Sequence, residues 1–407
     1  MIQTLLAILI SLVLAFVLSQ IFKVVGLPKV IGEICAGLIL GISVIKINFS
    51  SDALNALNFL ASLGIVLMFY YVGLETDFSV ATKKIKKSAM ISLFNTFLPL
   101  ILGFVVMRYL VGFDTLSSFI IGASLSVSAQ SVSIDILEEL RILKSKLGNI
   151  IISTGAIDDI IELILITSIL TLFYSNVTNI TTQHLLVNIL LFILIILFSR
   201  LVFVPITWKF FDREKSSTAR FMASIIIVLV FSLLSELLGI GLLIGAMAAG
   251  IIVRQTIIKD KSIPNWEEHD IAKSVHVVAF GFLIPLFFVS VGLRTDLSSI
   301  LSNLYLIVLF LIIAFIGTIG GTVLAVILNN GTLKEGLLLG FGLSPKGDIE
   351  LIIITLALQY GIINQSIFSS LVIMSLITTV ISTILFKKLV LKYHLSKNVK
   401  KSKYYYL

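Results

Sequence analysis

Three carboxylates stand close together inside an otherwise apolar stretch, "ISTGAIDDIIELILI" at residues 151–165: Asp158, Asp159 and Glu162. At the centre of a membrane-crossing helix, each ionised carboxylate costs about 2.5–3.5 kcal/mol on insertion scales. A carboxyl group removed from water beside a second carboxyl holds its proton more tightly, whereas water access and a small cation favour the ionised form. A proton and a cation can therefore compete for the same oxygens, which is the chemical requirement of ion exchange.

Helical spacing separates the two adjacent aspartates. Successive residues of a helix lie about 100° apart, so Asp158 and Asp159 cannot point into one cavity in the same way. Asp158 shares a stripe with Thr154 and Glu162, whereas Asp159 shares one with Gly155, Glu162 and Leu163. The small size of Gly155 leaves room for an ion or a crossing backbone. One carboxylate can face a water-filled passage while the other turns toward a neighbouring helix. Hard oxygen ligands of this kind suit Na⁺, Li⁺ or K⁺ rather than a soft transition metal.

The composition predicts the surroundings of these carboxylates. The chain has 407 residues, of which 58% are hydrophobic and 13% charged, more apolar surface than a water-soluble globule can bury. The net charge of +8 does not indicate a nucleic-acid partner, because little of the chain is polar. A single cysteine, Cys35, provides neither a disulfide framework nor a thiolate metal site. We therefore expect an all-α polytopic membrane protein in a lipid bilayer, without a cofactor.

About thirteen transmembrane helices are predicted, taking about 20 apolar residues as one crossing. They lie at about 3–22, 28–45, 55–74, 88–110, 116–136, 148–174, 185–207, 217–238, 239–254, 273–293, 301–328, 333–359 and 364–386.

Basic residues gather in alternate loops between these spans. With the N-terminus outside, the cytoplasmic loops hold Lys23; Lys83, Lys84, Lys86 and Lys87; Arg141, Lys144 and Lys146; Lys209, Arg213, Lys215 and Arg220; Arg254, Lys259 and Lys261; Lys334; and the tail from Lys387. The opposite loops, such as "YSNVTNITTQH" (174–184), are nearly free of Lys and Arg. The positive-inside rule then predicts a cell-membrane protein with an outside N-terminus and a cytoplasmic C-terminus.

An odd number of spans suits two six-span halves that are joined by a linker span and inserted in opposite orientations. The fifth span then pairs with the twelfth, and both look interrupted: "GASLSVSAQSVS" (122–133) is rich in Gly and Ser, and "GFGLSPKGDIE" (340–350) carries glycines and a proline. Broken helices at matching positions of two halves indicate a substrate site near the bilayer midplane. The alternative is that the Ser hydroxyls bond back to their own helix and Pro345 only kinks its own.

Six motifs in order resemble the monovalent cation:proton antiporters, in the branch of the Kef-type potassium efflux proteins and the electrogenic bacterial sodium/proton exchangers. They are "LPKVIGEICAGLILG" (27–41), "LGIVLMFYYVGLETDF" (63–78), "AIDDI" (156–160), "IGAMAAGIIV" (244–253), "IPLFFVSVGLRTDL" (284–297) and "SPKGDIELI" (344–352). The resemblance covers almost the whole chain. It implies an inverted-repeat fold in which a core bundle moves against a dimerisation domain of a homodimer. It also implies that Asp159 carries the cation and the proton, that Asp158 is its partner, and that Ser128 lines the site.

The same resemblance divides the chain into domains. The expected boundaries are 1–82 for dimerisation helices 1–3, 83–175 for core helices 4–6, 185–215 for linker helix 7, 216–297 for dimerisation helices 8–10, 298–390 for core helices 11–13 and 391–407 for a short basic cytoplasmic tail.

Three departures from the family pattern bear on mechanism. Electrogenic relatives carry a lysine in the eleventh span where this chain has Thr318. Without that lysine, the simplest outcome is that Asp158 stays protonated while Asp159 alone alternates between a proton and a cation. One proton is then exchanged for one cation. The usual Arg-Gly-Glu of the twelfth span is replaced by Lys346 and Asp348 around a glycine, with Lys346 as the best local counter-charge. Glu162 is an extra acid, either a third titrating group or a side chain facing water at the outer funnel.

Three functions are consistent with these features. The first is a cation:proton exchanger for Na⁺, with Li⁺ or K⁺ as alternatives. The second is a Kef-like potassium efflux transporter or channel, which usually appends a nucleotide-binding domain that this sequence does not show after the last span. The third is a cation-coupled symporter, which requires a roomier polar cavity. An enzyme is the least favoured class, because no nucleophile–base pair, metal cluster or cofactor loop stands out.

Overall fold

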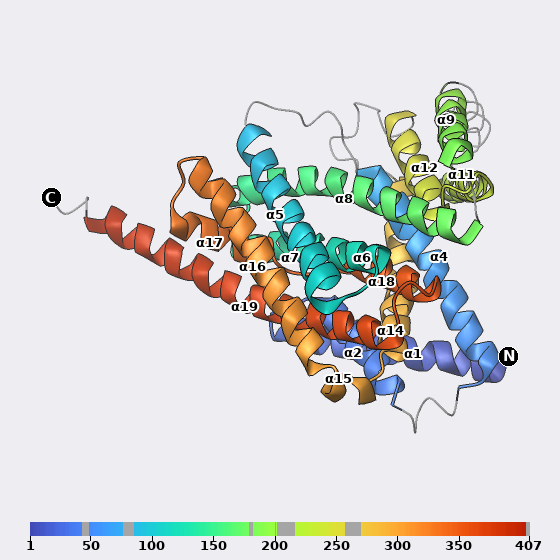
Figure 1. Ribbon diagram of the computed structural model, residues 1–407, viewed down its shortest axis with the longest axis horizontal. Helices are drawn as coiled ribbons and strands as arrows, with labels where there is room; N and C mark the ends of the chain where they lie inside the picture. Colours follow the sequence, from blue (N-terminus) through green and yellow to red (C-terminus); the bar gives the residue numbers. More distant parts are fainter. Residues whose placement is uncertain are drawn as a thin grey trace. The chain divides into compact units, whose positions relative to one another are not determined.

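The computed structural model describes residues 1–42, 49–75, 85–178, 182–199, 201, 216–256 and 270–403, and within these ranges the regular elements are all helices (Figure 1). Helices dominate because a lipid environment leaves the backbone no water to bond, so each segment must satisfy its own N–H and C=O groups. Several basic residues that predict the orientation lie outside the described ranges: Lys83, Lys84, Lys209, Arg213, Lys215, Lys259 and Lys261. So does most of the second half of the expected linker helix, 202–215.

Eight helical segments within the described ranges are long and apolar enough to cross a membrane by length and composition. They are Ile2–Val24, Ser51–Glu75, Lys86–Val111, Thr115–Glu139, Ser217–Leu237, Asp270–Arg294, Leu304–Leu328 and Gln365–Lys392. Each coincides with one predicted span. The other predicted spans fall on helices that are short, interrupted or charged, so the structure supports a multi-pass fold and the number of crossings beyond eight stays a prediction.

The chain forms two compact units. Unit 1 comprises Met1–Leu18, Gly32–Val80 and Ile164–Arg294, and unit 2 comprises Ser19–Ile31, Ala81–Leu163 and Thr295–Leu407.

Unit 1 is built around closely packed helices. Its elements are most of α1 (Ile2–Val24) and α2 (Lys29–Leu40), α4 (Ser51–Glu75), the end of α8 (Lys146–Thr178), α9 (Thr182–Phe198), α11 (Ser217–Leu237), α12 (Leu242–Thr256), α13 (Asp270–Val278), the π-helix η5 (Ala279–Leu283) and α14 (Ile284–Arg294). Gly37 of α2 meets Gly292 of α14, and Gly73 of α4 meets Gly250 of α12. A Cβ at any of these positions would collide with backbone, so small residues allow these helices to approach closely.

Unit 2 contains the acidic stretch and both interrupted helices. Its elements are α5 (Ile85–Val105), the π-helix η1 (Val106–Val111), α6 (Thr115–Ser126), α7 (Gln130–Glu139), the first half of α8 (Lys146–Thr178), α15 (Ser298–Ser302), α16 (Leu304–Leu328), α17 (Leu333–Gly342), α18 (Asp348–Gln359) and α19 (Gln365–Lys403). Helices α5 and α16 pack side by side (Figure 1), with Gly317 and Gly321 of α16 against Pro99 and Phe94 of α5.

The two interruptions lie where Gly, Ser and Pro predict them. Helix α6 ends at Ser126 and α7 begins at Gln130, while α17 ends at Gly342 and α18 begins at Asp348. The backbone N–H of Ala129 donates to the carbonyl of Pro345 at 2.7 Å, so the two breaks meet. Helix α19 continues beyond residue 390 to Lys403, so much of the basic segment predicted as a tail is helical.

Candidate functional site

Helix α8 presents its acidic residues to two different environments. Thr154 and Asp158 are 0% exposed and Glu162 is 2% exposed, so the stripe with a spacing of four residues is buried. Asp159 is exposed, and within the described part of the chain it forms no hydrogen bond. The 100° step between neighbours on a helix explains why adjacent aspartates differ in this way.

Asp158 accepts hydrogen bonds on both carboxylate oxygens. Ser92 Oγ and Thr96 Oγ1, the latter at 3.3 Å, donate to Oδ1. Asn95 Nδ2, at 3.4 Å, and Gln130 Nε2 donate to Oδ2. The three α5 residues share one helix face because they are three and four positions apart. Neutral groups from α5 and α7 therefore surround the buried carboxyl group.

Further polar groups continue this cluster toward α16 and the helix break. Asn95 Nδ2 also donates to Ser128 Oγ at 3.1 Å, and Thr322 Oγ1 donates to Asn95 Oδ1 at 3.3 Å. Thr318, one turn before Thr322, is 0% exposed, and its hydroxyl has no hydrogen-bond partner among the described residues. At Thr318, which the family resemblance aligns with a lysine, the structure thus has a buried hydroxyl without a partner among the described residues.

The unwound segment between α6 and α7 is held by side chains. Ser128 donates its backbone N–H to Glu162 Oε1 at 3.0 Å. Lys346 Nζ donates to the carbonyls of Leu125 at 2.6 Å and Val127 at 2.7 Å. A break inside an apolar environment frees such groups, and here one acid and one ammonium satisfy them. The ammonium also lies at the C-terminal end of α6, where the helix dipole favours positive charge.

Lys346 acts on several acids from this position. It is 2% exposed and interacts electrostatically with Glu350, Glu162 and Asp158. Glu350 is 0% exposed, its Oε2 accepts from Ser375 Oγ at 3.1 Å, and its Oε1 has no partner among the described groups. Lys346 is thus a counter-charge to a group of acids, while its hydrogen bonds go to carbonyls.

Asp348 and Gly155 are two further residues that the sequence analysis singles out. Asp348, the first residue of α18, is half-buried and its carboxylate repels that of Asp159. The space beside Gly155 that the sequence leaves open for an ion is filled by the Gln130 side chain. The burial of Glu162, and its bond to Ser128, favour a role at the helix break over a position facing water.

Sequence reasoning missed the donors to Asp158. Ser92, Asn95 and Thr96 form a polar stripe inside the predicted fourth span, and that stripe is the signal that could have identified them. Gln130 follows the predicted interruption directly, and no local pattern pairs it with the sixth span.

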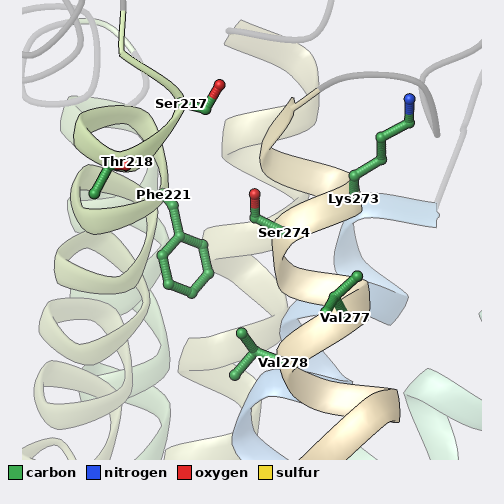
Figure 2. Close-up of a pocket in the computed structure, with 7 residues that line it drawn as sticks. All are labelled: Ser217, Thr218, Phe221, Lys273, Ser274, Val277 and Val278. Carbon is green, nitrogen blue, oxygen red and sulfur yellow. The ribbon is translucent and has the colours of Figure 1, made fainter.

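A separate cavity of about 400 Å³ lies in unit 1, between the start of α11 and α13. Figure 2 shows Phe221 and Val278 pointing toward one another from these two helices. Lys273 is the one charged residue among those that line it, and none of the acidic residues described above reaches it. Its chemistry therefore does not suit a cation, and unit 2 holds the candidate site.

A helical membrane fold in which two interrupted helices meet beside buried carboxylates is the architecture of a secondary transporter. The chain matches the family model described as sodium/hydrogen exchanger, transmembrane, over residues 8–392, and it belongs to this family of membrane antiporters. The resemblance drawn from the six motifs is thereby confirmed.

Individual relatives extend this result. A Na(+)/H(+) antiporter of Enterococcus hirae is 27% identical over 370 residues, covering 91% of this chain and 93% of that protein. The Na(+)/H(+)-K(+) antiporter GerN of Bacillus cereus is 27% identical over 88% of each chain. The sodium proton antiporter MjNhaP1 of Methanocaldococcus jannaschii shares the fold, with a TM-score of 0.66 at 15% identity over 95% of this chain and 97% of that one.

Proposed function

We propose that this chain is a secondary active antiporter that exchanges a monovalent cation, Na⁺ in the first place, for protons by alternating access, and that both ions compete for Asp159. The observation that carries the proposal is the contrast on α8: Asp159 is exposed and has no hydrogen-bond partner in the described structure, whereas Asp158 has four donors and no exposure. A free carboxylate can accept either ion.

The other ligands would come from the helix break. Ser128 lies there and connects through Asn95 to Asp158, so its hydroxyl is a candidate to line the path. Thr154 offers a second buried hydroxyl that has no partner among the described groups. Hydroxyl, carbonyl and carboxylate oxygens suit Na⁺, Li⁺ and K⁺ alike. The printed names of the relatives include both Na(+) and K(+), which supports this class of substrate.

The architecture we propose is a homodimer of thirteen-span subunits with inverted repeats, the N-terminus outside and the C-terminus in the cytoplasm. The core domain would comprise 83–175 and 298–390, and the dimerisation domain 1–82 and 216–297. The composition of the two compact units supports this division, since unit 2 groups Ala81–Leu163 with Thr295–Leu407 and unit 1 groups Gly32–Val80 with Ile164–Arg294.

A flux assay tests the exchange itself. Purified protein in proteoliposomes with a pH-sensitive dye inside should move protons when Na⁺, Li⁺ or K⁺ is added outside, and the cation with the largest response is the preferred substrate. Cation uptake without opposite proton movement would instead indicate the channel or efflux alternative of Kef type. Proton and cation moving together with a solute would indicate a symporter.

Electroneutral exchange is a prediction from Thr318. No lysine stands at that position to pair with Asp158 and release it when a cation binds. Only Asp159 then alternates between a proton and a cation, so one proton crosses the membrane for each cation. An imposed potassium-diffusion potential should therefore drive no Na⁺-coupled proton movement when no other gradient is present. Thr318→Lys should move the protein toward voltage sensitivity. Clear voltage-driven exchange by the unaltered protein would contradict this interpretation of Thr318.

A further inference from the structure

We infer that the side-chain oxygen of Gln130, Oε1, is a ligand of the transported cation and acts together with the Asp159 carboxylate. The inference deepens the proposed function and rests on it, because it adds a neutral oxygen to the site at which Asp159 is proposed to hold the ion. Gln130 is the first residue of α7, directly after the helix break.

The Gln130 amide is buried, and only one of its two ends has a partner. The residue is 7% exposed, and its Nε2 donates to Asp158 Oδ2. Its Oε1 is buried and has no hydrogen-bond partner among the described residues. Asn95 donates to the same Asp158 oxygen but has both ends bonded, because its Oδ1 accepts from Thr322 Oγ1 at 3.3 Å. Most buried polar atoms in proteins have a partner, so a buried oxygen without one requires an explanation.

The orientation of the Gln130 amide does not depend on a proton at Asp158. The hydroxyls of Ser92 and Thr96 lie at Oδ1 and can accept as well as donate, so they can bond to the ionised or the protonated carboxyl group. Oδ2 receives the amide nitrogens of Asn95 and Gln130, and an amide nitrogen only donates. Oδ2 is therefore an acceptor in both states, and the Gln130 amide keeps its nitrogen toward Asp158.

Oε1 takes the place of the side chain that Gly155 lacks. A Cβ on Gly155 would collide with Oε1, so the oxygen lies directly against this residue of α8. Gly155 and Asp159 are four positions apart, and Cβ atoms with this spacing lie about 5–6 Å from one another on one helix face. Because helical side chains lean toward the N-terminus, the Asp159 side chain leans over the turn that Gly155 begins. The Gln130 amide thus connects the two aspartates: its nitrogen bonds to Asp158, and its oxygen lies on the stripe of Asp159.

A monovalent cation at Asp159 exchanges part of its hydration water for protein oxygens. Asp159 is exposed, so an ion can reach its carboxylate from water. An amide oxygen is a hard ligand of the same kind as a backbone carbonyl, and it adds no charge to the site. A cation between the Asp159 carboxylate and Oε1 gives the buried oxygen of Gln130 its partner.

Two substitutions act on this oxygen from opposite sides. Gln130→Ala removes it, whereas Gly155→Ala displaces it and keeps the amide. The Gly155→Ala protein should stay folded, because the atom that must move is the end of a flexible side chain and alanine forms helix better than glycine. Na⁺ binding to purified protein in detergent is measured by isothermal titration calorimetry at fixed pH. Each change should weaken it by about tenfold or more, the effect expected for one polar contact to a charged group.

The double variant Gln130→Ala/Gly155→Ala distinguishes one shared oxygen from two separate effects. If both changes act on Oε1, the new Cβ at position 155 takes the room that the shortened side chain has left. The double variant should then bind Na⁺ about as weakly as either single variant, because changes that act on one contact do not add. Thr96→Val is the matched control: it removes a donor to Asp158 and keeps the side-chain shape, without taking an oxygen from the stripe of Asp159. Its loss of Na⁺ affinity should be smaller than that of Gln130→Ala.

The outcomes separate this inference from the proposed function. Losses of affinity that add in the double variant would show that Gly155 acts through its own packing, and equal losses from Thr96→Val and Gln130→Ala would show that Gln130 acts only as a donor to Asp158. Either result, or unchanged Na⁺ affinity in both single variants, overturns the ligand role of Oε1 while exchange at Asp159 stands.

An unaltered protein that shows neither Na⁺ binding nor cation-dependent proton flux would instead overturn the proposed function, and the inference with it. If the Gln130→Ala protein does not elute as a single peak in size-exclusion chromatography, Gln130→Met replaces it as the single variant. Methionine keeps the length of the side chain and removes the amide, so the same loss of Na⁺ affinity is expected.

Discussion

Replacing Asp159 with asparagine should abolish cation-dependent proton flux in proteoliposomes while leaving insertion and folding intact. The amide keeps the shape of the side chain but can neither carry a proton nor neutralise a cation. Folding should survive because Asp159 is exposed and, in the described structure, contributes no hydrogen bond that the substitution would break. The proton-flux signal should therefore be lost in a protein whose size-exclusion elution profile and melting temperature are unchanged.

Asp158→Asn is the informative control. It keeps one oxygen for Ser92 and Thr96 but turns an amide nitrogen toward the donors Asn95 and Gln130. Exchange should slow, since the hydrogen bonds that support Asp158 beside the site are altered, yet transport should remain measurable because the role of Asp158 is a supporting one. Robust exchange by the Asp159→Asn protein would show that the cation and proton are carried elsewhere.

Lys346→Met should have the second large effect, a loss of both stability and exchange. The substitution leaves the carbonyls of Leu125 and Val127 without their donor, and each buried unsatisfied group costs about 1–3 kcal/mol. It also removes the positive charge that acts on Glu350, Glu162 and Asp158. The melting temperature in detergent should fall clearly, and flux should be lost even in protein that elutes as a single peak.

Lys346→Arg serves as the matched comparison, because arginine stands at this position in the family pattern. It keeps the charge, and its planar fork can donate to two acceptors at once. Near-normal stability and retained exchange are expected. A Lys346→Met protein that melts and transports like the unaltered one would contradict the role assigned to the ammonium at the helix break.

The local features of this site could be predicted from the sequence because they depend on one segment at a time. Glycine, serine and proline predict the interruptions at 127–129 and 343–347, where the structure has them. The 100° step predicts that Asp158 and Asp159 differ in surroundings, and the shared stripe predicts that Thr154 accompanies Asp158, whereas it places Glu162 with both aspartates. Those patterns follow from backbone geometry alone.

The partners of these residues could not be predicted, because they come from other helices. Nothing in a single sequence pairs Ser92, Asn95 and Thr96 with Asp158, some 60 positions away, and the hydrogen bonds of Lys346 join residues more than 200 positions apart. The filling of the space beside Gly155 could likewise not be predicted, because Gln130 reaches it from another helix. Tertiary packing decides contacts of this range, and side-chain periodicity carries no information about them.

The pH dependence of cation affinity tests competition at Asp159 most directly. The apparent Na⁺ affinity should be measured from proton flux in proteoliposomes with equal pH on both sides, in steps from about pH 6 to about pH 8. If one carboxyl holds either ion, the affinity should weaken about tenfold for each pH unit below the pKa of the site, each decade being about 1.4 kcal/mol. An affinity that stays flat across this range while transport remains coupled to protons would mean that the two ions bind at separate sites.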